Sequence, residues 1–271
     1  MPRPHLIIFS DLDGTLLDHD DYRWQAAGPA LARLKAANIP LVLNSSKTVP
    51  EIRALREELG NKDPFIVENG AAVVIPHHAL GNAEEEVVNF GATRDRVLEV
   101  LGAQRKTGAR FKGFADMSAD ELAAETGLDP AAAARAKERL GTEPLLWQGT
   151  ADELVHFEEA LGAEQLRLVA GGRFLHAMGI FDKADGARFL LNKYKEQYRE
   201  QYGDEPVLAI ALGDSPNDQQ MLESADIPVV IRGVKSEEVQ LPSTRHAMRS
   251  LKPGPEGWNE CVLNLLVEYG Y

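Results

Sequence analysis

Cysteine and long apolar runs are both scarce in this sequence. Cys261 is the only cysteine among 271 residues, so no intramolecular disulfide can form. No run approaches the roughly 18 apolar residues of a membrane-spanning helix. The first largely apolar run, Leu6 to Ser10, is too short for the hydrophobic segment of a secretory signal peptide. We therefore expect a soluble, cytoplasmic protein without a membrane partner.

Positive charge is also in deficit. Lysine and arginine number 29 against 42 aspartate and glutamate residues, which gives a formal net charge of −13. This surplus repels nucleic acids and anionic lipid surfaces, so we expect neither as a partner. The glycine-rich loops typical of nucleotide binding do not occur. An anionic ligand would need cations or a metal gathered locally.

Both ends of the chain alternate short apolar runs with helical patterns, which indicates a parallel sheet covered by helices. Expected strands are His5 to Ser10, Ile39 to Leu43, Phe65 to Val67, Val207 to Leu212 and Ile227 to Ile231. Expected helices are Trp24 to Ala37, Val49 to Leu59, Asp182 to Tyr202 and Asn217 to Ser224. The fold class is therefore α/β with a doubly wound parallel sheet.

The middle of the chain differs, because helices and strands there do not alternate regularly. Expected helices are Thr93 to Gln104, Ser118 to Thr126 with a capping box, Pro130 to Leu140 and Thr150 to Leu161. Expected strands are Leu145 to Gln148, Gln165 to Ala170 and Phe174 to Met178. We expect a discontinuous core of residues 1–85 and 180–271, interrupted by an α+β domain of residues 86–179.

Two acidic motifs follow predicted strands. Asp11 and Asp13 come directly after the first strand, and Asp214 and Asp218 follow the strand Val207 to Leu212. Ligands of such sheets bind beyond the carboxyl ends of the strands. The first motif alone could be a solvated turn. Two acidic loops converging on one edge would repel each other without a cation, which predicts a divalent metal, most simply Mg²⁺.

Two further segments suit an anion. Ser45, Ser46 and Lys47 follow the second strand and offer hydroxyl, backbone N–H and ammonium groups, although ordinary helix capping by the serines is the alternative. Lys183 stands in the first turn of a predicted helix, where the helix dipole disfavours a cation unless an anionic site lies opposite.

These motifs together resemble the haloacid dehalogenase superfamily of phosphotransferases. The residues that carry the resemblance are Asp11-Leu12-Asp13-Gly14-Thr15, Ser45, Lys183 and Gly213-Asp214-Ser215 with Asn217-Asp218, in that order. The insert after the second motif resembles the larger α+β cap, termed C2, of this superfamily. Flanking segments, Tyr22 with Trp24, Ser45 to Thr48, Pro64 to Ala71, Arg139 with Glu143-Pro144, and Gly171 to Phe174, resemble the mannosyl-3-phosphoglycerate phosphatases over nearly the whole chain.

The resemblance implies a reaction and roles for the core residues. Asp11 would be the nucleophile that forms an aspartyl-phosphate, and Asp13 the general acid and base. Mg²⁺ would be held by Asp11, by the Asp13 backbone carbonyl, and by Asp214 and Asp218. Ser45, Lys183 and Asn217 would bind the phosphoryl group.

Substrate choice would belong to the cap and to residues near it. Ser46, Lys47, Asn69, Arg139, Glu143 and Arg173 are the candidates for contacts with the carboxylate and sugar hydroxyls of a phosphorylated glycoside. Two alternatives stay open at this point. Gly171 and Gly172 are also typical of a turn between strands, and Arg139 with Glu143 could be a solvated pair at a helix end.

The expected activity is Mg²⁺-dependent hydrolysis of mannosyl-3-phosphoglycerate to mannosylglycerate, a compatible solute, by a monomer or homodimer. Glucosyl-3-phosphoglycerate or another sugar phosphate is the alternative substrate. A phosphomutase and a non-catalytic binding protein are more distant alternatives. His77 with His78, Cys261, and the tyrosines Tyr194, Tyr198 and Tyr202 read as surface or packing residues.

Overall fold

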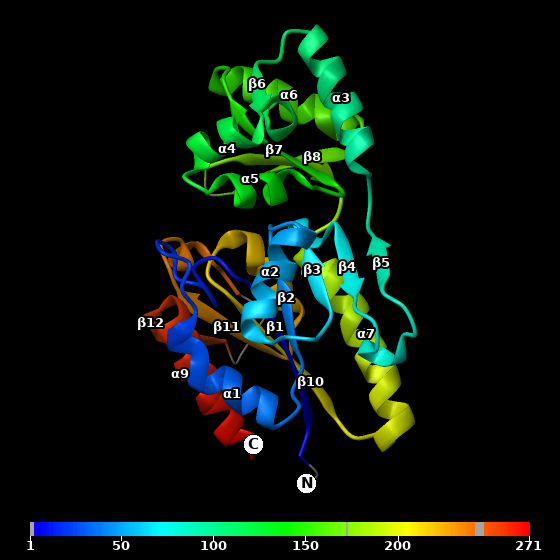
Figure 1. Ribbon diagram of the computed structural model, residues 1–271, viewed down its shortest axis with the longest axis vertical. Helices are drawn as coiled ribbons and strands as arrows, with labels where there is room; N and C mark the ends of the chain where they lie inside the picture. The colour runs from blue at the N-terminus through cyan, green and yellow to red at the C-terminus, as the bar shows by residue number, and fades with distance from the viewer. Residues whose placement is uncertain (1–2, 172, 242–246) are drawn as a thin grey trace.

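Two β-sheets organise the chain in the computed structural model, which describes residues 3–171, 173–241 and 247–271. The larger sheet has the strand order β12-β11-β10-β1-β2-β3-β4-β5, and the smaller one the order β6-β7-β9-β8. Figure 1 shows the small sheet and its helices stacked above the large sheet. The chain is thus an α/β core built on a largely parallel sheet, with a separate α+β cap, as the sequence predicts.

The large sheet is parallel through six strands and ends in two antiparallel ones. Its strands are β1 (His5–Ser10), β2 (Leu41–Asn44), β3 (Phe65–Val67), β4 (Ala72–Ile75), β5 (Glu86–Asn89), β10 (Val207–Gly213), β11 (Ile227–Arg232) and β12 (Met248–Pro253). In the central pair, β1 and β10, Ser10 lies opposite Leu212. The carboxyl ends of both strands therefore lie side by side at the same edge of the sheet.

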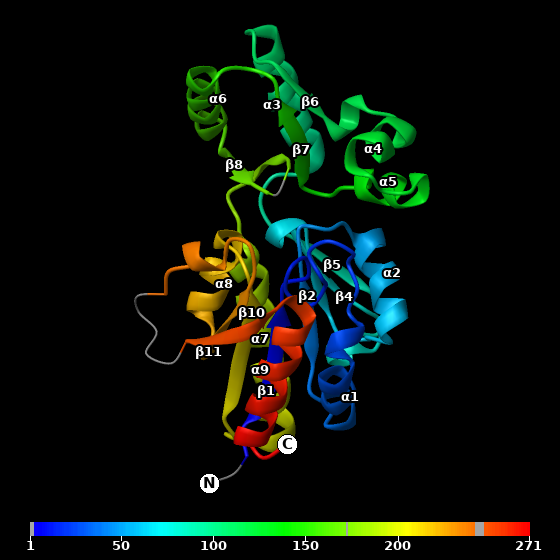
Figure 2. The same ribbon diagram turned by 90° about the vertical axis from the view of Figure 1, so that its left-hand side faces the viewer.

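Helices cover both faces of this sheet, as near-continuous apolar strands require. They are α1 (Gly28–Ala36), α2 (Val49–Leu59), α7 (Lys183–Tyr202), α8 (Gln219–Ser224) and α9 (Gly254–Glu268). One core cluster joins α1, α2 and α9 to the sheet, and a second joins α7 and α8 to its other face. Figure 2 shows α2 and α8 on opposite sides. Among the described residues no helix is long and apolar enough to cross a membrane.

The cap is an antiparallel sheet with helices packed against it. Its strands are β6 (Phe111–Gly113), β7 (Thr142–Trp147), β8 (Leu166–Ala170) and β9 (Leu175–Gly179). Its helices are α3 (Arg94–Lys106), α4 (Ala119–Thr126), α5 (Pro130–Lys137) and α6 (Ala151–Ala163). The predicted capping box at Ser118 is confirmed, since its hydroxyl accepts the Glu121 N–H.

Four strands escaped prediction: β4, β5, β6 and β12. β5 and β12 are the two edges of the large sheet, and most of their residues are exposed. An exposed edge strand needs no continuous apolar run, so its sequence can resemble that of a loop. β5 pairs with β4 in the large sheet, just beyond the expected boundary at residue 85. The division into a core and a cap at residues 85 and 180 stays a prediction.

We expect the contact of α9 with the sheet to stabilise the core strongly. Trp258 is fully buried, and its indole N–H donates to Ser10 Oγ at 3.0 Å. Trp258→Ala should lower the free energy of unfolding by about 3–5 kcal/mol, measured by denaturant titration. Val267→Ala, on the same helix but 71% exposed, is the control and should change it by less than about 0.5 kcal/mol. Equal effects would contradict this role of α9.

Candidate active site

The carboxyl ends of β1 and β10 bring the two acidic motifs together. Asp11 follows the last residue of β1, and Asp214 follows the last residue of β10. Between Asp13 and Thr15 the chain turns at Gly14, whose φ is +82°. A Cβ there would lie 2.6 Å from Asp214 Oδ2, so this turn can approach the second motif only with glycine.

Three buried carboxylates form a compact cluster at this edge. Ligand oxygens of Asp11, Asp214 and Asp218 lie within 4.8 Å of one another. Burial, and then repulsion from Asp218, raise the pKa of Asp11 well above its ordinary value and that of Asp214 to about 6. Carboxylates held in this way against their own repulsion fit a hard divalent cation such as Mg²⁺.

Lys183 lies inside the cluster and is 1% exposed. Its Nζ is 2.5 Å from Asp11 Oδ1 and 2.6 Å from Asp218 Oδ1. Burial alone would lower its pKa, but Asp11 and Asp218 outweigh this effect and raise the pKa above the ordinary lysine value. The ammonium is thus a fixed charge, and the carboxylates explain why a cation is tolerated at the start of α7.

Asp218 also organises the loop that carries Asp214. Its Oδ2 accepts the N–H groups of Asp214 at 3.1 Å and Ser215 at 3.2 Å. Thr15 Oγ1 lies 3.4 Å from Asp214 Oδ1 and ties this loop back to the first motif. Asn217 is half-buried beside Asp218, and its side-chain oxygen accepts from Ser215 Oγ. The loop is therefore held by the Asp218 carboxylate and by Thr15 of the first motif.

The segment after β2 forms the neighbouring wall of the site. Ser45 is buried, and its Oγ accepts the Lys47 N–H at 3.2 Å. Thr48, rather than either serine, caps α2, so the alternative that the serines are helix caps is wrong. Lys47 Nζ lies 2.8 Å from Asp13 Oδ1. Burial lowers the pKa of Lys47, but Asp13 and Glu51 more than compensate and raise it to about 12.

Asn69 lies beside this segment in the loop after β3. It is buried with a φ of +58°, and its backbone N–H donates to the Ser45 carbonyl at 2.9 Å. Its side-chain Oδ1 is buried without a hydrogen-bond partner in the part of the chain that the structure describes. A buried acceptor in this state suits a hydroxyl or amine of a ligand.

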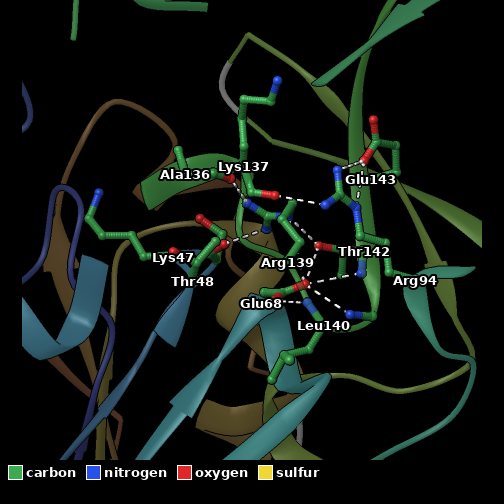
Figure 3. A network of polar contacts seen from close by, with 12 residues as sticks. Lys47, Thr48, Glu68, Arg94, Ala136, Lys137, Arg139, Leu140, Thr142 and Glu143 are labelled. Carbon is green, nitrogen blue, oxygen red and sulfur yellow. Dashed lines mark hydrogen bonds and ion pairs between the residues drawn. The ribbon is translucent and has the colours of Figure 1, made fainter. Parts of the chain in front are cut away.

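The predicted cap residues lie in different environments. Arg139 is buried and donates to Ser46 O at 2.9 Å, and Glu143 is buried and accepts from Arg94 Nη2 at 2.9 Å (Figure 3). The alternative of an exposed Arg139–Glu143 pair is therefore wrong. Arg173 is exposed and donates to the Glu125 carbonyl. Gly171 precedes Gly172, which lies outside the described residues, and Gly171 N donates to Phe174 O in the turn between β8 and β9.

Two residues near this site were not predicted. Glu68 is fully buried at the junction of core and cap, inside the buried segment Phe65–Ala71. A carboxylate in such a run requires partners, and this is the signal that could have identified it. His176 lies on β9 opposite Pro144. Burial, assisted by Arg139, lowers its pKa to about 3, so the imidazole is neutral.

Comparisons with known proteins agree with this geometry. A family model described as haloacid dehalogenase-like hydrolase matches residues 8–92. A glucosyl-3-phosphoglycerate/mannosyl-3-phosphoglycerate phosphatase of Methanococcoides burtonii is 38% identical and covers 96% of this chain and 97% of its own length. A protein of the same name from Persephonella marina is 37% identical over 97% of this chain and 98% of its own.

Solved structures show the same fold at low sequence identity. A haloacid dehalogenase-like hydrolase from Bacteroides thetaiotaomicron has a TM-score of 0.66 at 21% identity, covering 96% of this chain and 99% of its own. The sucrose-phosphatase of Synechocystis, solved with sucrose and phosphate, has a TM-score of 0.63 at 13% identity, covering 98% of both chains.

We expect Lys183 to stabilise the fold as well as the site. Lys183→Met leaves Asp11 and Asp218 buried without their cation and should lower the free energy of unfolding by about 3–5 kcal/mol. Denaturant titration in EDTA measures this without interference from metal. Lys195→Met removes an exposed lysine of the same helix and should change stability by less than about 0.5 kcal/mol. Equal stabilities of the two variants would contradict the expectation.

Proposed function

The chain belongs to the haloacid dehalogenase-like hydrolases and is a phosphoric monoester hydrolase, and from this premise we propose that it is a Mg²⁺-dependent mannosyl-3-phosphoglycerate phosphatase. The observation that carries the proposal is the cluster in which Lys183 joins Asp11 and Asp218 beside Asp214. The full-length likeness to relatives named for glucosyl- and mannosyl-3-phosphoglycerate supports the substrate class.

Asp11 is the nucleophile in this proposal. One of its oxygens attacks phosphorus, the bond from phosphorus to the glycerate oxygen breaks, and an aspartyl-phosphate forms. A water molecule then attacks the same phosphorus, and the carboxylate leaves with phosphate released. Attack requires the ionised carboxylate, which the ammonium of Lys183 favours from 2.5 Å. Burial and repulsion from Asp218 oppose ionisation and leave the pKa of Asp11 raised even with Lys183 in contact, so Lys183 favours the ionised nucleophile but does not secure it alone.

Asp13 moves the protons. It gives a proton to the departing glycerate oxygen and later takes one from the attacking water. Lys47 contacts Asp13 at 2.8 Å, so a substrate carboxylate that attracts this ammonium would compete with Asp13 for it. Substrate binding would then release Asp13 from Lys47 for proton transfer.

The remaining core residues bind the phosphoryl group and the metal. Ser45, Lys183 and Asn217 contact the phosphoryl oxygens, whose negative charge spreads in the transition state. Asp11, Asp214, Asp218 and the backbone carbonyl of Asp13 would hold Mg²⁺. When bound, the metal supplies charge that stabilises the phosphoryl oxygens and the ionised carboxylates.

The cap and the adjoining loops select the substrate. Lys47 and Asn69 are the best placed of the predicted contacts, because Lys47 lies at Asp13 and Asn69 has a free buried acceptor among the described residues. Ser46 is half-buried beside them. Arg139 and Glu143 already bond to protein groups, and Arg173 lies at an exposed turn. For these three residues a direct substrate contact stays a prediction.

A panel of substrates tests the proposed function. Phosphate release should be fastest, by kcat/KM, with mannosyl-3-phosphoglycerate. Glucosyl-3-phosphoglycerate is the second candidate, since both substrates appear in the names of the relatives. Glucose 6-phosphate, mannose 6-phosphate and p-nitrophenyl phosphate complete the panel. Asp11→Asn should abolish turnover with every substrate while the circular dichroism spectrum stays unchanged.

Three outcomes would contradict the proposal. A preference for plain sugar phosphates would overturn the substrate class. Transfer of phosphate to a second sugar hydroxyl, detected as a sugar bisphosphate or an isomerised phosphate, would indicate a phosphomutase. Undiminished turnover in Asp11→Asn would exclude this residue as the nucleophile.

Metal removal tests the second part of the proposal. Activity should disappear in excess EDTA and return with Mg²⁺. Because the cation binds the folded carboxylate cluster, Mg²⁺ at about a hundred times its Kd should also raise the free energy of unfolding by about 2.7 kcal/mol. Robust turnover in EDTA would show that the reaction does not need the metal.

A further inference from the structure

Three consecutive residues after β3 adopt left-handed backbone conformations. The φ angles of Glu68, Asn69 and Gly70 are +52°, +58° and +98°. Side chains other than that of glycine disfavour this region, and a run of such residues persists only where surrounding contacts hold it. This loop is held by contacts with three parts of the molecule: the segment after β2, the start of α7 and the cap.

Two of these parts belong to the core. Glu68 N donates to Lys47 O at 3.0 Å, and Asn69 N donates to Ser45 O at 2.9 Å. Gly70 packs so closely on the start of α7 that a Cβ there would lie 2.0 Å from Asp182 O. The loop therefore touches both the segment that carries Ser45 and Lys47 and the backbone that precedes Lys183.

The third part is the cap, which the Glu68 side chain contacts. Its Oε1 accepts the Leu140 N–H at 2.6 Å, and its Oε2 accepts the Gly141 N–H at 3.2 Å and the Thr142 N–H at 3.0 Å. Thr142 Oγ1 adds a fourth donor at 2.7 Å. One carboxylate of the core thus holds three successive residues of the cap (Figure 3).

Arg139 contacts both Glu68 and the core segment that follows β2. Its guanidinium lies 3.7 Å from Glu68 Oε2 and donates to Thr142 Oγ1 at 2.7 Å and to Ser46 O at 2.9 Å. Ser46 is the neighbour of both Ser45 and Lys47. The position of the cap at residues 139–142 and that of the loop at residues 45–47 are therefore fixed by the same group of polar contacts.

We propose that Glu68 is a positioning residue that couples the cap to the loop of Ser45, Ser46 and Lys47. It acts through Arg139 and through the backbone of residues 140–142. This inference rests on the proposed function, in which the cap selects the substrate and the core performs phosphoryl transfer. A substrate with groups beyond its phosphate needs the cap in place, whereas a small aryl phosphate needs only the core.

Glu68→Gln tests this coupling, because it keeps the shape of the side chain but turns an acceptor toward the cap into a donor. With mannosyl- or glucosyl-3-phosphoglycerate, KM should rise about tenfold or more, the size expected when hydrogen bonds to a buried carboxylate are lost. With p-nitrophenyl phosphate, which uses Ser45 but does not reach the cap, KM should rise several-fold less than with the glycosyl phosphoglycerates. Thr142→Val, which removes one donor to Glu68, should show a smaller effect of the same kind.

Asp63→Asn is the matched control. Asp63 is a half-buried core carboxylate that accepts the Leu41 N–H at 2.9 Å, before β3 and away from the cap. This variant should leave the ratio of the two KM values unchanged. Equal losses with both substrates in Glu68→Gln, or no change with either, would overturn the proposal. A merely structural role lowers the amount of active enzyme, and this reduces kcat for both substrates without raising KM.

Hydrogen–deuterium exchange separates this proposal from the proposed function. Glu68→Gln and Thr142→Val should both speed exchange in the peptide that spans residues 45–48, whereas Asp63→Asn should not. That readout needs no substrate. If the native enzyme ignores glycosyl phosphoglycerates but the exchange result holds, the substrate is wrong and the coupling stands. Unchanged exchange in residues 45–48 of both variants would overturn the coupling itself.

Discussion

The buried contact of Lys183 with Asp11 and Asp218 is the interaction on which the rest of the site depends. Parallel strands β1 and β10 end at the same edge, so any carboxylates that follow them are forced together. Water cannot screen them there, and burial raises the pKa of Asp11 and Asp214. An ammonium between two of the carboxylates offsets this repulsion with a charge that does not titrate near neutral pH. The helix that supplies it, α7, begins at Lys183 because Asp182 caps it by accepting the N–H groups of Ala184 and Asp185.

Backbone geometry is the second requirement, since the carboxylates and the ammonium must approach without intervening side chains. Gly14 lets the first acidic turn reach Asp214, and Gly70 lets the loop after β3 rest on the backbone of Asp182. These two close approaches arrange the strand ends and the start of α7 around one point. In the proposed function the phosphoryl group binds at that point. The two glycines therefore help to position the residues that bind it, although neither glycine takes part in the chemistry.

The convergence of the two acidic motifs could be predicted from the sequence, because its signals are local. An acidic pair after an apolar run marks a strand end, and two such pairs in a parallel sheet must converge. The edge strands β5 and β12 were not predicted, because exposed strands lack that apolar run. The partners of Glu68 and Arg139 were not predicted either. Glu68 contacts residues more than 70 positions away, and no periodicity or spacing encodes a contact made only after the cap has packed on the core.

The net charge of −13 adds a further constraint on anion binding. The cations nearest the acidic cluster already have protein partners: Lys183 contacts Asp11 and Asp218, and Lys47 contacts Asp13. Any anionic ligand must therefore compete with aspartates of the protein for each of them. A generic anion gains little from that exchange, because it replaces one ion pair with another. In the proposed function, a substrate that also reaches the cap gains additional contacts, so selectivity would follow from the same ion pairs that stabilise the site without a substrate.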